Sequence, residues 1–203
     1  MANSHRVWSR MNHFILRRPK REVPSAAERP LHDQRGVTLI ELMATIAVLG
    51  ILLTVAVPNM KEMARSYEVS SKANYWMNVL NFARSEASRR GQRVTLCPSG
   101  NGVSCSGSSN LHSGWIAFAD TNNNATVDLG EAILKVGSVD NTYTYVLSGT
   151  ANTYISFISN GMTKTIGNAS WSGNIKICLE AGAPGRQVTI SAVGRSKVEN
   201  VGC

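Results

Sequence analysis

The sequence lacks most of the residues and motifs on which enzymes rely. Beyond residue 36 it contains a single histidine, His112, in a stretch rich in glycine and serine. Neither a G-x-S-x-G nor an H-E-x-x-H motif occurs, and there is no glycine-rich phosphate loop. We therefore expect a protein that is not an enzyme and that needs no cofactor.

Charged residues are absent from one long stretch, with a single exception. Val37–Val57 is an apolar run of 21 residues, close to the ~20 that a helix needs to cross the hydrocarbon of a bilayer. Its only ionisable residue is Glu41. A carboxylate inside a bilayer is costly unless it is paired or reaches the interface, so Glu41 is a candidate functional residue.

Acidic residues are also scarce at the N-terminus. Residues 1–36 contain eight Lys/Arg and three Asp/Glu, whereas residues 37–203 contain thirteen and ten. Basic residues that flank a membrane helix tend to remain in the cytoplasm. We therefore expect a cytoplasmic N-terminus, a single membrane span, and residues 59–203 on the other side of the membrane.

Cysteine is sparse, and no two cysteines form a C-x-x-C pair. The four cysteines, Cys97, Cys105, Cys178 and Cys203, all follow the apolar run. A metal site of four thiolates is therefore disfavoured, whereas an even number of cysteines in an exported segment indicates two disulfides. Of the three possible pairings we favour Cys97–Cys105 with Cys178–Cys203, because each closes a short loop and the second holds the C-terminus.

The string R-G-V-T-L-I-E-L-M at residues 35–43 resembles the class III signal of type IV prepilins and type II secretion pseudopilins. The resemblance implies that a prepilin peptidase cleaves after Gly36 and N-methylates Val37, a position at which the family usually has Phe. Residues 1–36 are then a leader that is removed. Translation from Met11 would make this leader shorter.

The same resemblance gives Glu41 a role in assembly. It implies that the carboxylate pairs with the α-amine of a neighbouring subunit inside the apolar core of a filament. Removing one partner of a buried ion pair costs ~3–5 kcal/mol, so we expect Glu41→Ala to remain in the membrane but to stay out of filaments. The alternative is an ordinary membrane anchor whose carboxylate extends to the lipid headgroups.

After the apolar run, the sequence follows the spacing of an amphipathic helix. Six apolar residues recur at intervals of three and four: Val69, Ala73, Trp76, Leu80, Ala83 and Ala87. The pattern predicts one helix over residues 37–90, kinked at Pro58 and ended by Gly91. Its first half, residues 37–58, suits lipid and neighbouring subunits. Its second half, residues 59–91, suits packing against a globular head.

From residue 92 the pattern changes to short alternating runs separated by turn residues. Nine runs are predicted to be strands: Arg93–Cys97, Trp115–Ala119, Ala132–Val136, Thr142–Leu147, Tyr154–Ile158, Met162–Ile166, Ile175–Leu179, Arg186–Ala192 and Arg195–Val198. Asn160-Gly161 between two of them predicts a hairpin turn. The expected fold class is α+β, with a long N-terminal spine helix packed on an antiparallel β head over residues 92–203, as in pilins.

Further motifs resemble the FimT/GspH group of minor type IV pilins and type II secretion pseudopilins. They comprise L-N-F-A-R-S-E-A at residues 80–87, V-T-L-C-P at 94–98, G-W-I at 114–116, the stretch from Asp120 to Glu131 and the late Gly-Arg strands. Together with the signal they cover nearly all of residues 35–203. The resemblance implies a structural filament subunit whose partners are prepilin peptidase, the inner membrane, and other pilins or pseudopilins.

A loop rich in Asp and Asn follows the run that ends at residue 119. Between Asp120 and Glu131, oxygen side chains occupy positions 1, 3, 5, 9 and 12, the spacing of an EF-hand calcium loop. Position six is Ala125 instead of the glycine that such a loop needs. We therefore favour a β-loop whose side chains cap their own backbone over calcium binding, and we expect no metal site.

The C-terminal hairpin contains three cations beside glycines: Arg186, Arg195 and Lys197. Glycines let such cations approach a phosphate backbone closely. In the FimT branch, a Gly-Arg-x-Arg-like element near the C-terminus is associated with DNA binding during natural transformation. Here the last position is Lys197, which keeps the charge but lacks the bidentate fork of arginine. The alternative is a set of solvated charges that protect an edge strand from aggregation.

These observations predict a minor pilin or pseudopilin that is processed at Gly36 and assembled through its N-terminal helix into a type IV pilus or a type II secretion pseudopilus. Two alternatives stay open. One is a GspH-type pseudopilin that acts only in type II protein secretion, and the other is a membrane-anchored DNA-receptor module. The expected location is the inner membrane, with the head in the periplasm, and then the filament.

Overall fold

The computed structural model describes residues 36–203 of the chain, except for the side chains of residues 55 and 58. The chain comprises two units, which divide after Ile46. Of the expected leader, residues 1–36, only Gly36 falls within the described part. Cleavage after Gly36 therefore stays a prediction.

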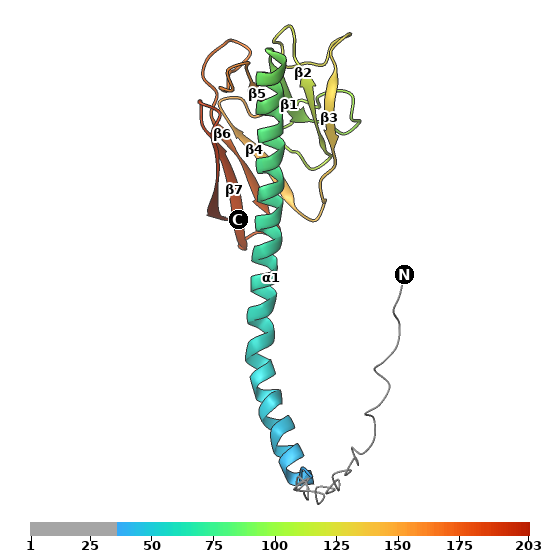
Figure 1. Ribbon diagram of the computed structural model, residues 1–203, viewed down its shortest axis with the longest axis vertical. Helices are drawn as coiled ribbons and strands as arrows, with labels where there is room; N and C mark the ends of the chain where they lie inside the picture. Colours follow the sequence, from blue (N-terminus) through green and yellow to red (C-terminus); the bar gives the residue numbers. More distant parts are fainter. Residues whose placement is uncertain (1–35) are drawn as a thin grey trace, which may run out of the picture. The chain divides into compact units, whose positions relative to one another are not determined.

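One long helix, α1, runs from Leu39 to Arg90 (Figure 1). Its sequence is rich in alanine, leucine, methionine, glutamate and arginine, which are strong helix formers. Gly91 has a φ of 66° and ends the helix in the left-handed conformation that is common just beyond a last helical turn. The predicted helix and its end at Gly91 are confirmed. The backbone remains helical through residue 58, and the segments Leu39–Thr54 and Asn59–Arg90, on either side of the predicted kink, are bent by 42°.

The C-terminal half of α1 packs against the head through one stripe of side chains. The six stripe residues from Val69 to Ala87 are each at most 1% exposed, as their spacing predicted. Three of them are alanines, which let the helix lie close to the sheets. Trp76 and Leu80 fill the space between helix and sheets. Truncating a buried leucine to alanine costs ~2–5 kcal/mol, so this stripe holds the helix firmly on the head.

The head consists of two four-stranded sheets. The first has the order β3-β2-β1-β5 and contains β1 Val94–Pro98, β2 Trp115–Ala119, β3 Ile133–Gly137 and β5 Ile155–Phe157. The second has the order β4-β6-β7-β8 and contains β4 Thr144–Gly149, β6 Gly173–Cys178, β7 Pro184–Ile190 and β8 Ser196–Gly202. All neighbouring strands are antiparallel, which confirms the α+β class (Figure 1).

Both sheets share one hydrophobic core with α1. Trp76, Trp115 and Trp171 are fully buried in it. The first sheet is also covered on its other face, where Ile116 and Phe118 form a second, smaller cluster. β1 and β2 are therefore buried along their whole length, which explains why their sequences are apolar instead of alternating.

The prediction of a strand at Met162–Ile166 is wrong. The Asn160-Gly161 turn is present, and Thr163 bridges Phe157, but the pairing extends no further than isolated bridges. The Thr163 hydroxyl instead donates to the Trp171 carbonyl at 2.8 Å. The backbone N–H groups of the segment are divided among three partners: those of residues 163, 164 and 165 donate to the carbonyls of Ala192, Ser156 and Ala169. The segment therefore forms no continuous ladder with one neighbouring strand.

Two disulfides cross-link the head, Cys97–Cys105 and Cys178–Cys203, with Cα–Cα distances of 5.6 and 5.8 Å. The favoured pairing is confirmed, and residues 36–203 contain no free cysteine. The second bond joins the end of β6 to the residue that follows β8. Gly185 lies against this bond, because a Cβ there would overlap the Sγ of Cys203.

Candidate functional site: the start of α1 and the β7–β8 hairpin

The first turn of α1 is built around Thr38 and Glu41. The Glu41 N–H donates to the Thr38 hydroxyl at 3.3 Å, and the Leu42 N–H donates to the Thr38 carbonyl at 3.1 Å. Thr38 is therefore the N-cap, and Glu41 occupies the third helical position, as in a capping box. The unpaired N–H groups of a first turn favour negative charge, typically by ~0.3–1 kcal/mol where the site is exposed.

The side chains that follow this turn are apolar and exposed. Leu42 is 58% exposed and Ile51 is 69% exposed. The hydroxyls of Thr45 and Thr54 each donate to a carbonyl one turn earlier, at 2.8 and 2.7 Å, so they need no outside partner. An apolar surface of this extent suits lipid tails or the helices of other subunits.

By length and composition, no single helix within residues 36–203 could cross a membrane. A bent pair of segments, Leu39–Thr54 and Asn59–Arg90, meets these two criteria only when both are taken together. The first segment overlaps the predicted membrane half, residues 37–58.

The β7–β8 hairpin brings two of the three predicted cations together. Arg195 and Lys197 line a groove of about 390 Å³. Its other lining residues are Thr189, Ser191, Val193 and Ser196. Lys197 lies 2.8 Å from a carboxylate oxygen of Glu199, and the hydrogen bonds from Lys197 and from the Thr189 hydroxyl lower the pKa of Glu199. Arg195 is exposed and makes no ion pair within the part of the chain that the structure describes.

The third cation, Arg186, does not join that groove. Its guanidinium donates to the hydroxyl of Ser66 on α1 at 3.1 Å. Side chains alternate along a strand, so Arg186 shares its face of the sheet with the buried Val188. Lys197 pairs with Thr189 and therefore lies on the opposite face. The structure thus separates Arg186 from Arg195 and Lys197.

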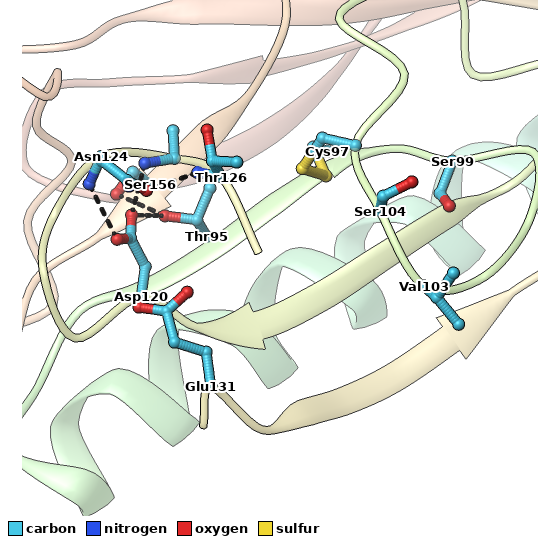
Figure 2. The surroundings of a disulfide bond; sticks show 12 residues. Thr95, Cys97, Ser99, Val103, Ser104, Asp120, Asn124, Thr126, Glu131 and Ser156 are labelled. Atoms are coloured by element: carbon cyan, nitrogen blue, oxygen red, sulfur yellow. Dashed lines mark hydrogen bonds between the residues drawn. A yellow bond between two sulfur atoms is a disulfide. The ribbon is translucent and has the colours of Figure 1, made fainter. Parts of the chain in front are cut away.

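The loop from Asp120 to Glu131 is shaped by its own carboxylates (Figure 2). Asp120 is fully buried, and its carboxylate accepts the Thr95 hydroxyl at 2.7 Å. The same carboxylate accepts the N–H groups of Asn124 and Ala125 at 3.0 and 3.1 Å. The loop is therefore anchored to β1 at its first residue.

The other two carboxylates of this loop also bind groups of the loop itself. Glu131 accepts the N–H of Thr121 at 2.7 Å and that of Asp128 at 3.1 Å. Asp128 accepts the side-chain amides of Asn122 and Asn124, both at 2.7 Å, and these hydrogen bonds lower the pKa of Asp128. The hydrogen bonds are those of the self-capping loop that we favoured. Across residues 36–203, no group of His, Cys, Asp and Glu side chains is arranged to hold a metal ion.

A buried polar network beneath the loop was not predicted from the sequence. Arg93 is only 4% exposed, and its guanidinium donates to the hydroxyl of Ser156 at 3.3 Å and to the side chain of Asn168 at 3.0 Å. The Thr95 hydroxyl bridges Ser156 and Asp120, at 3.0 and 2.7 Å. Figure 2 shows the part of this network formed by Asp120, Thr95 and Ser156. With Arg93 on the other side of Ser156, two buried opposite charges are linked through two hydroxyl groups.

Comparison with protein families gives two matches. The family described as type II transport protein GspH matches residues 72–194, which is more than half of the chain. The prokaryotic N-terminal methylation motif matches residues 31–57. Comparison with curated proteins gave no match.

Two solved structures are similar to this chain, and both are crystal forms of the type IV minor pilin FimU from Pseudomonas aeruginosa PAO1. The sequence identity is 20% in both comparisons, and the TM-scores are 0.47 and 0.49. The alignments cover 64% and 68% of this chain, and 91% and 92% of the FimU chains.

Proposed function

This chain belongs to the GspH family of type II transport proteins, and from that membership we propose that it is a minor pilin or pseudopilin, a structural subunit of a cell-envelope filament. One observation carries the proposal: an exposed apolar segment at the start of α1 has a single ionisable residue, Glu41, in its capped first turn. The match to the N-terminal methylation motif covers the same segment.

Processing is part of this proposal. A prepilin peptidase would cleave after Gly36 and methylate the α-amine of Val37. Both residues are exposed and precede the first helical residue, Leu39, so the bond between them is accessible. Cleavage would create a positive amine one residue before the N-cap Thr38.

Assembly follows from the same two groups. In an apolar filament core, the new amine of one subunit and the Glu41 carboxylate of its neighbour would both lose their water. Paired, they neutralise each other, whereas removal of one partner costs ~3–5 kcal/mol. A subunit that lacks either group would therefore be left out of the filament.

We place the chain in the inner membrane, with its N-terminus in the cytoplasm and its head in the periplasm. Anchoring by the N-terminal helix follows from the methylation motif. The orientation is supported by the eight Lys/Arg against three Asp/Glu that precede Val37. The two disulfides suit an oxidising compartment such as the periplasm.

Mass spectrometry of the membrane fraction tests the proposal. In cells with an active prepilin peptidase, we expect the chain to begin at Val37 and to carry one methyl group on its α-amine. Gly36→Leu should leave the leader attached, because a bulky side chain then precedes the cleaved bond. Gly50→Ala changes an exposed helical glycine away from that bond and should be processed normally. An unprocessed native chain under these conditions would contradict the proposal.

Deletion of the gene distinguishes the two kinds of filament. Loss of protein secretion with normal pili would assign the chain to the type II secretion pseudopilus. Loss of pili, or of DNA uptake, with normal secretion would assign it to a type IV pilus.

DNA binding is a second candidate function, favoured by the groove that Arg195 and Lys197 share. Arg195 makes no ion pair within the described residues, and Lys197 would have to share its charge between Glu199 and a phosphate. Cations among hydroxyl side chains suit contacts with phosphates that do not depend on base sequence. We expect the full chain in detergent to retain duplex DNA at low salt and to release it as salt rises, with a slope of about −0.9 per neutralised phosphate.

A matched set of variants tests this second function. Replacing Arg195 and Lys197 together by alanine should abolish DNA retention. Arg186→Ala removes the same charge from the α1 side of the sheet and should leave retention unchanged. Undiminished retention by the double variant would exclude DNA binding at this groove.

A further inference from the structure

β8 forms an open edge of the second sheet. Two other edges in the head are covered, β4 by residues 109–111 and β5 by residues 162–164. β3 is interrupted by a register shift against β2. β8 is seven residues long, contains no proline, and pairs only with β7 within residues 36–203. It is therefore the longest regular edge that the described head offers.

The register shows which backbone groups of β8 are unpaired. At one end of the hairpin the Ser191 N–H donates to the Arg195 carbonyl, and at the other the Cys203 N–H donates to the Ala183 carbonyl. Along an antiparallel strand, residues that are hydrogen-bonded to the partner alternate with residues that are not. Arg195 and Cys203 are bonded in this way, so the odd-numbered residues of β8 direct their backbone N–H and C=O groups toward β7. The even-numbered residues direct their N–H and C=O groups away from the sheet: Ser196, Val198, Asn200 and Gly202.

The side chains of β8 do not block this edge. Native edge strands are often protected from strand addition by charged side chains, especially lysine, or by proline. Here the charge of Lys197 is balanced by Glu199 at 2.8 Å, and Glu199 also accepts the Thr189 hydroxyl at 2.7 Å. On the opposite face Val198 is 38% exposed. The edge therefore offers an apolar contact on one face and a fixed ion pair on the other.

We propose that β8 accepts an extended segment of another polypeptide chain, which adds a fifth strand to the second sheet. Only an extended strand can satisfy a row of backbone donors and acceptors at every second residue. The edge selects an apolar side chain beside Val198, an acidic one beside Lys197 and a basic one beside Glu199. The proposal does not depend on the function proposed above, because it rests on the register of β8 alone.

Residues 195–202, as a free peptide, meet these requirements and serve as a probe. In an antiparallel alignment centred on Val198, the glutamate of the peptide lies opposite Lys197 and its lysine lies opposite Glu199. Valine lies opposite valine at the centre. A free peptide can adopt this alignment without any restriction from the membrane helix.

The test measures amide hydrogen exchange, residue by residue, in the full chain in detergent with and without the capped peptide. We expect the peptide to slow exchange by roughly tenfold or more at Val198 and Asn200, whose N–H groups are unpaired. Exchange at Lys197 and Glu199, which already face β7, should change little. The same peptide with N-methylvaline at its centre lacks the required donor and should protect nothing.

Two variants at one position complete the test. Val198→Pro removes an N–H that points away from β7, so it leaves the β7–β8 ladder intact and should abolish protection by the peptide. Val198→Ala keeps this N–H and should retain most of the protection. The proposal would be overturned by equal protection from the N-methylated peptide, by undiminished protection in Val198→Pro, or by no protection of the native chain. The peptide comparison holds even if the proline variant does not fold.

Discussion

Glu41 combines two roles at a single position. Its N–H completes the cap that Thr38 provides, and its carboxylate lies in the turn where unpaired N–H groups favour negative charge. In the proposed filament the same carboxylate receives the α-amine of a neighbour. The two roles can be tested separately, because the cap uses the backbone N–H of Glu41 and the ion pair uses its side-chain carboxylate.

We expect Glu41→Gln to keep the cap, since glutamine also suits this position of a capping box, and to lose the charge. The variant should be processed and remain in the membrane. If loss of one partner of the buried ion pair costs ~3 kcal/mol, incorporation of the variant into filaments should fall on the order of a hundredfold. Immunoblots of sheared filaments against membranes measure this ratio. Glu62→Gln, which removes an exposed charge beyond the apolar segment, is the control; normal incorporation of the Glu41 variant would exclude the assembly role.

A second prediction at this scale concerns Asp120. Its buried carboxylate accepts three hydrogen bonds, and the amide of Asp120→Asn has only one oxygen to accept them. At least one of these donors then loses its bond to a buried acceptor, so we expect a destabilisation of ~1–3 kcal/mol. Thermal unfolding of the full chain in detergent measures it. Asp128→Asn changes an exposed carboxylate of the same loop and should have a smaller effect.

The sequence indicated Glu41 because it is isolated in an apolar run, and it indicated the buried face of α1 through its spacing. The cap could also have been predicted from the sequence, since Thr38 and Glu41 form a T-x-x-E pattern. The burial of Arg93 could not have been predicted in this way. Its partner Asn168 lies 75 positions away, and no local pattern reports a contact at that distance.

At the scale of elements, α1 is joined to the segment between β3 and β4 by a polar contact. Lys72 lies 3.1 Å from the Asp140 carboxylate and 5.1 Å from the centre of the Tyr143 ring. The Tyr143 hydroxyl donates to Glu68 at 2.8 Å. Burial and this carboxylate raise the pKa of Tyr143 to about 12. Two successive turns of the helix thus hold one connection.

This contact predicts a local dependence on pH. Hydrogen bonds from Thr142 and then from Lys72 lower the pKa of Asp140 to about 2, from an ordinary value of 3.8. A carboxyl group whose pKa is lowered by folding stabilises the folded state at pH values above its ordinary pKa. The contribution of Asp140 to stability is therefore lost as the pH falls from about 4 to about 2. We expect amide exchange in residues 138–142 to accelerate over this range.

The control for that experiment lies at the other end of the helix. The pKa of Glu86 is also lowered to about 2, through hydrogen bonds from Arg89 and Arg90, so the overall stability does not separate the two groups. Asp140→Asn should abolish the pH step in residues 138–142 and leave the behaviour around Glu86 unchanged. If the pH step in amide exchange were unaltered in Asp140→Asn, a titratable group other than Asp140 would be its cause.

The limits of strands were harder to predict than their existence. Alternation continues through Met162–Ile166, yet no ladder forms there, because successive backbone N–H groups donate to the carbonyls of Ala192, Ser156 and Ala169, which lie in three different segments. β8 instead continues to Gly202, beyond the predicted end at Val198. Its partner β7 and the disulfide at Cys203 hold this segment, and neither is visible in the local sequence.

At the scale of the whole molecule, the two disulfides should contribute unequally. The bond Cys178–Cys203 spans 25 residues and Cys97–Cys105 spans eight. In the loop-entropy model, replacing both cysteines of the longer loop by serine costs roughly 3–4 kcal/mol, against roughly 2–3 for the shorter. Unfolding of the two double-serine chains in detergent checks this order. A larger loss from the shorter loop would mean that native contacts, not chain entropy, dominate.

The arrangement of cations in the hairpin was only partly visible in the sequence. Arg186, Val188 and Ile190 are spaced two residues apart along β7, and this spacing already indicates that all three lie on the buried face of the sheet. Grouping Arg186 with Arg195 and Lys197 overlooked that signal. The division of the head into two sheets could not be predicted from the sequence pattern, because it depends on pairing between strands that are far apart in the sequence.

Gly185 has a consequence for mutational tolerance. Any side chain there would overlap the Cys203 sulfur and would also lie 2.8 Å from the Ile177 carbonyl. Substitution should therefore hinder formation of the disulfide more than it disturbs the neighbouring side chains. A saturation scan under oxidising conditions should show depletion at this glycine as severe as at the two cysteines, and under reducing conditions part of that depletion should disappear.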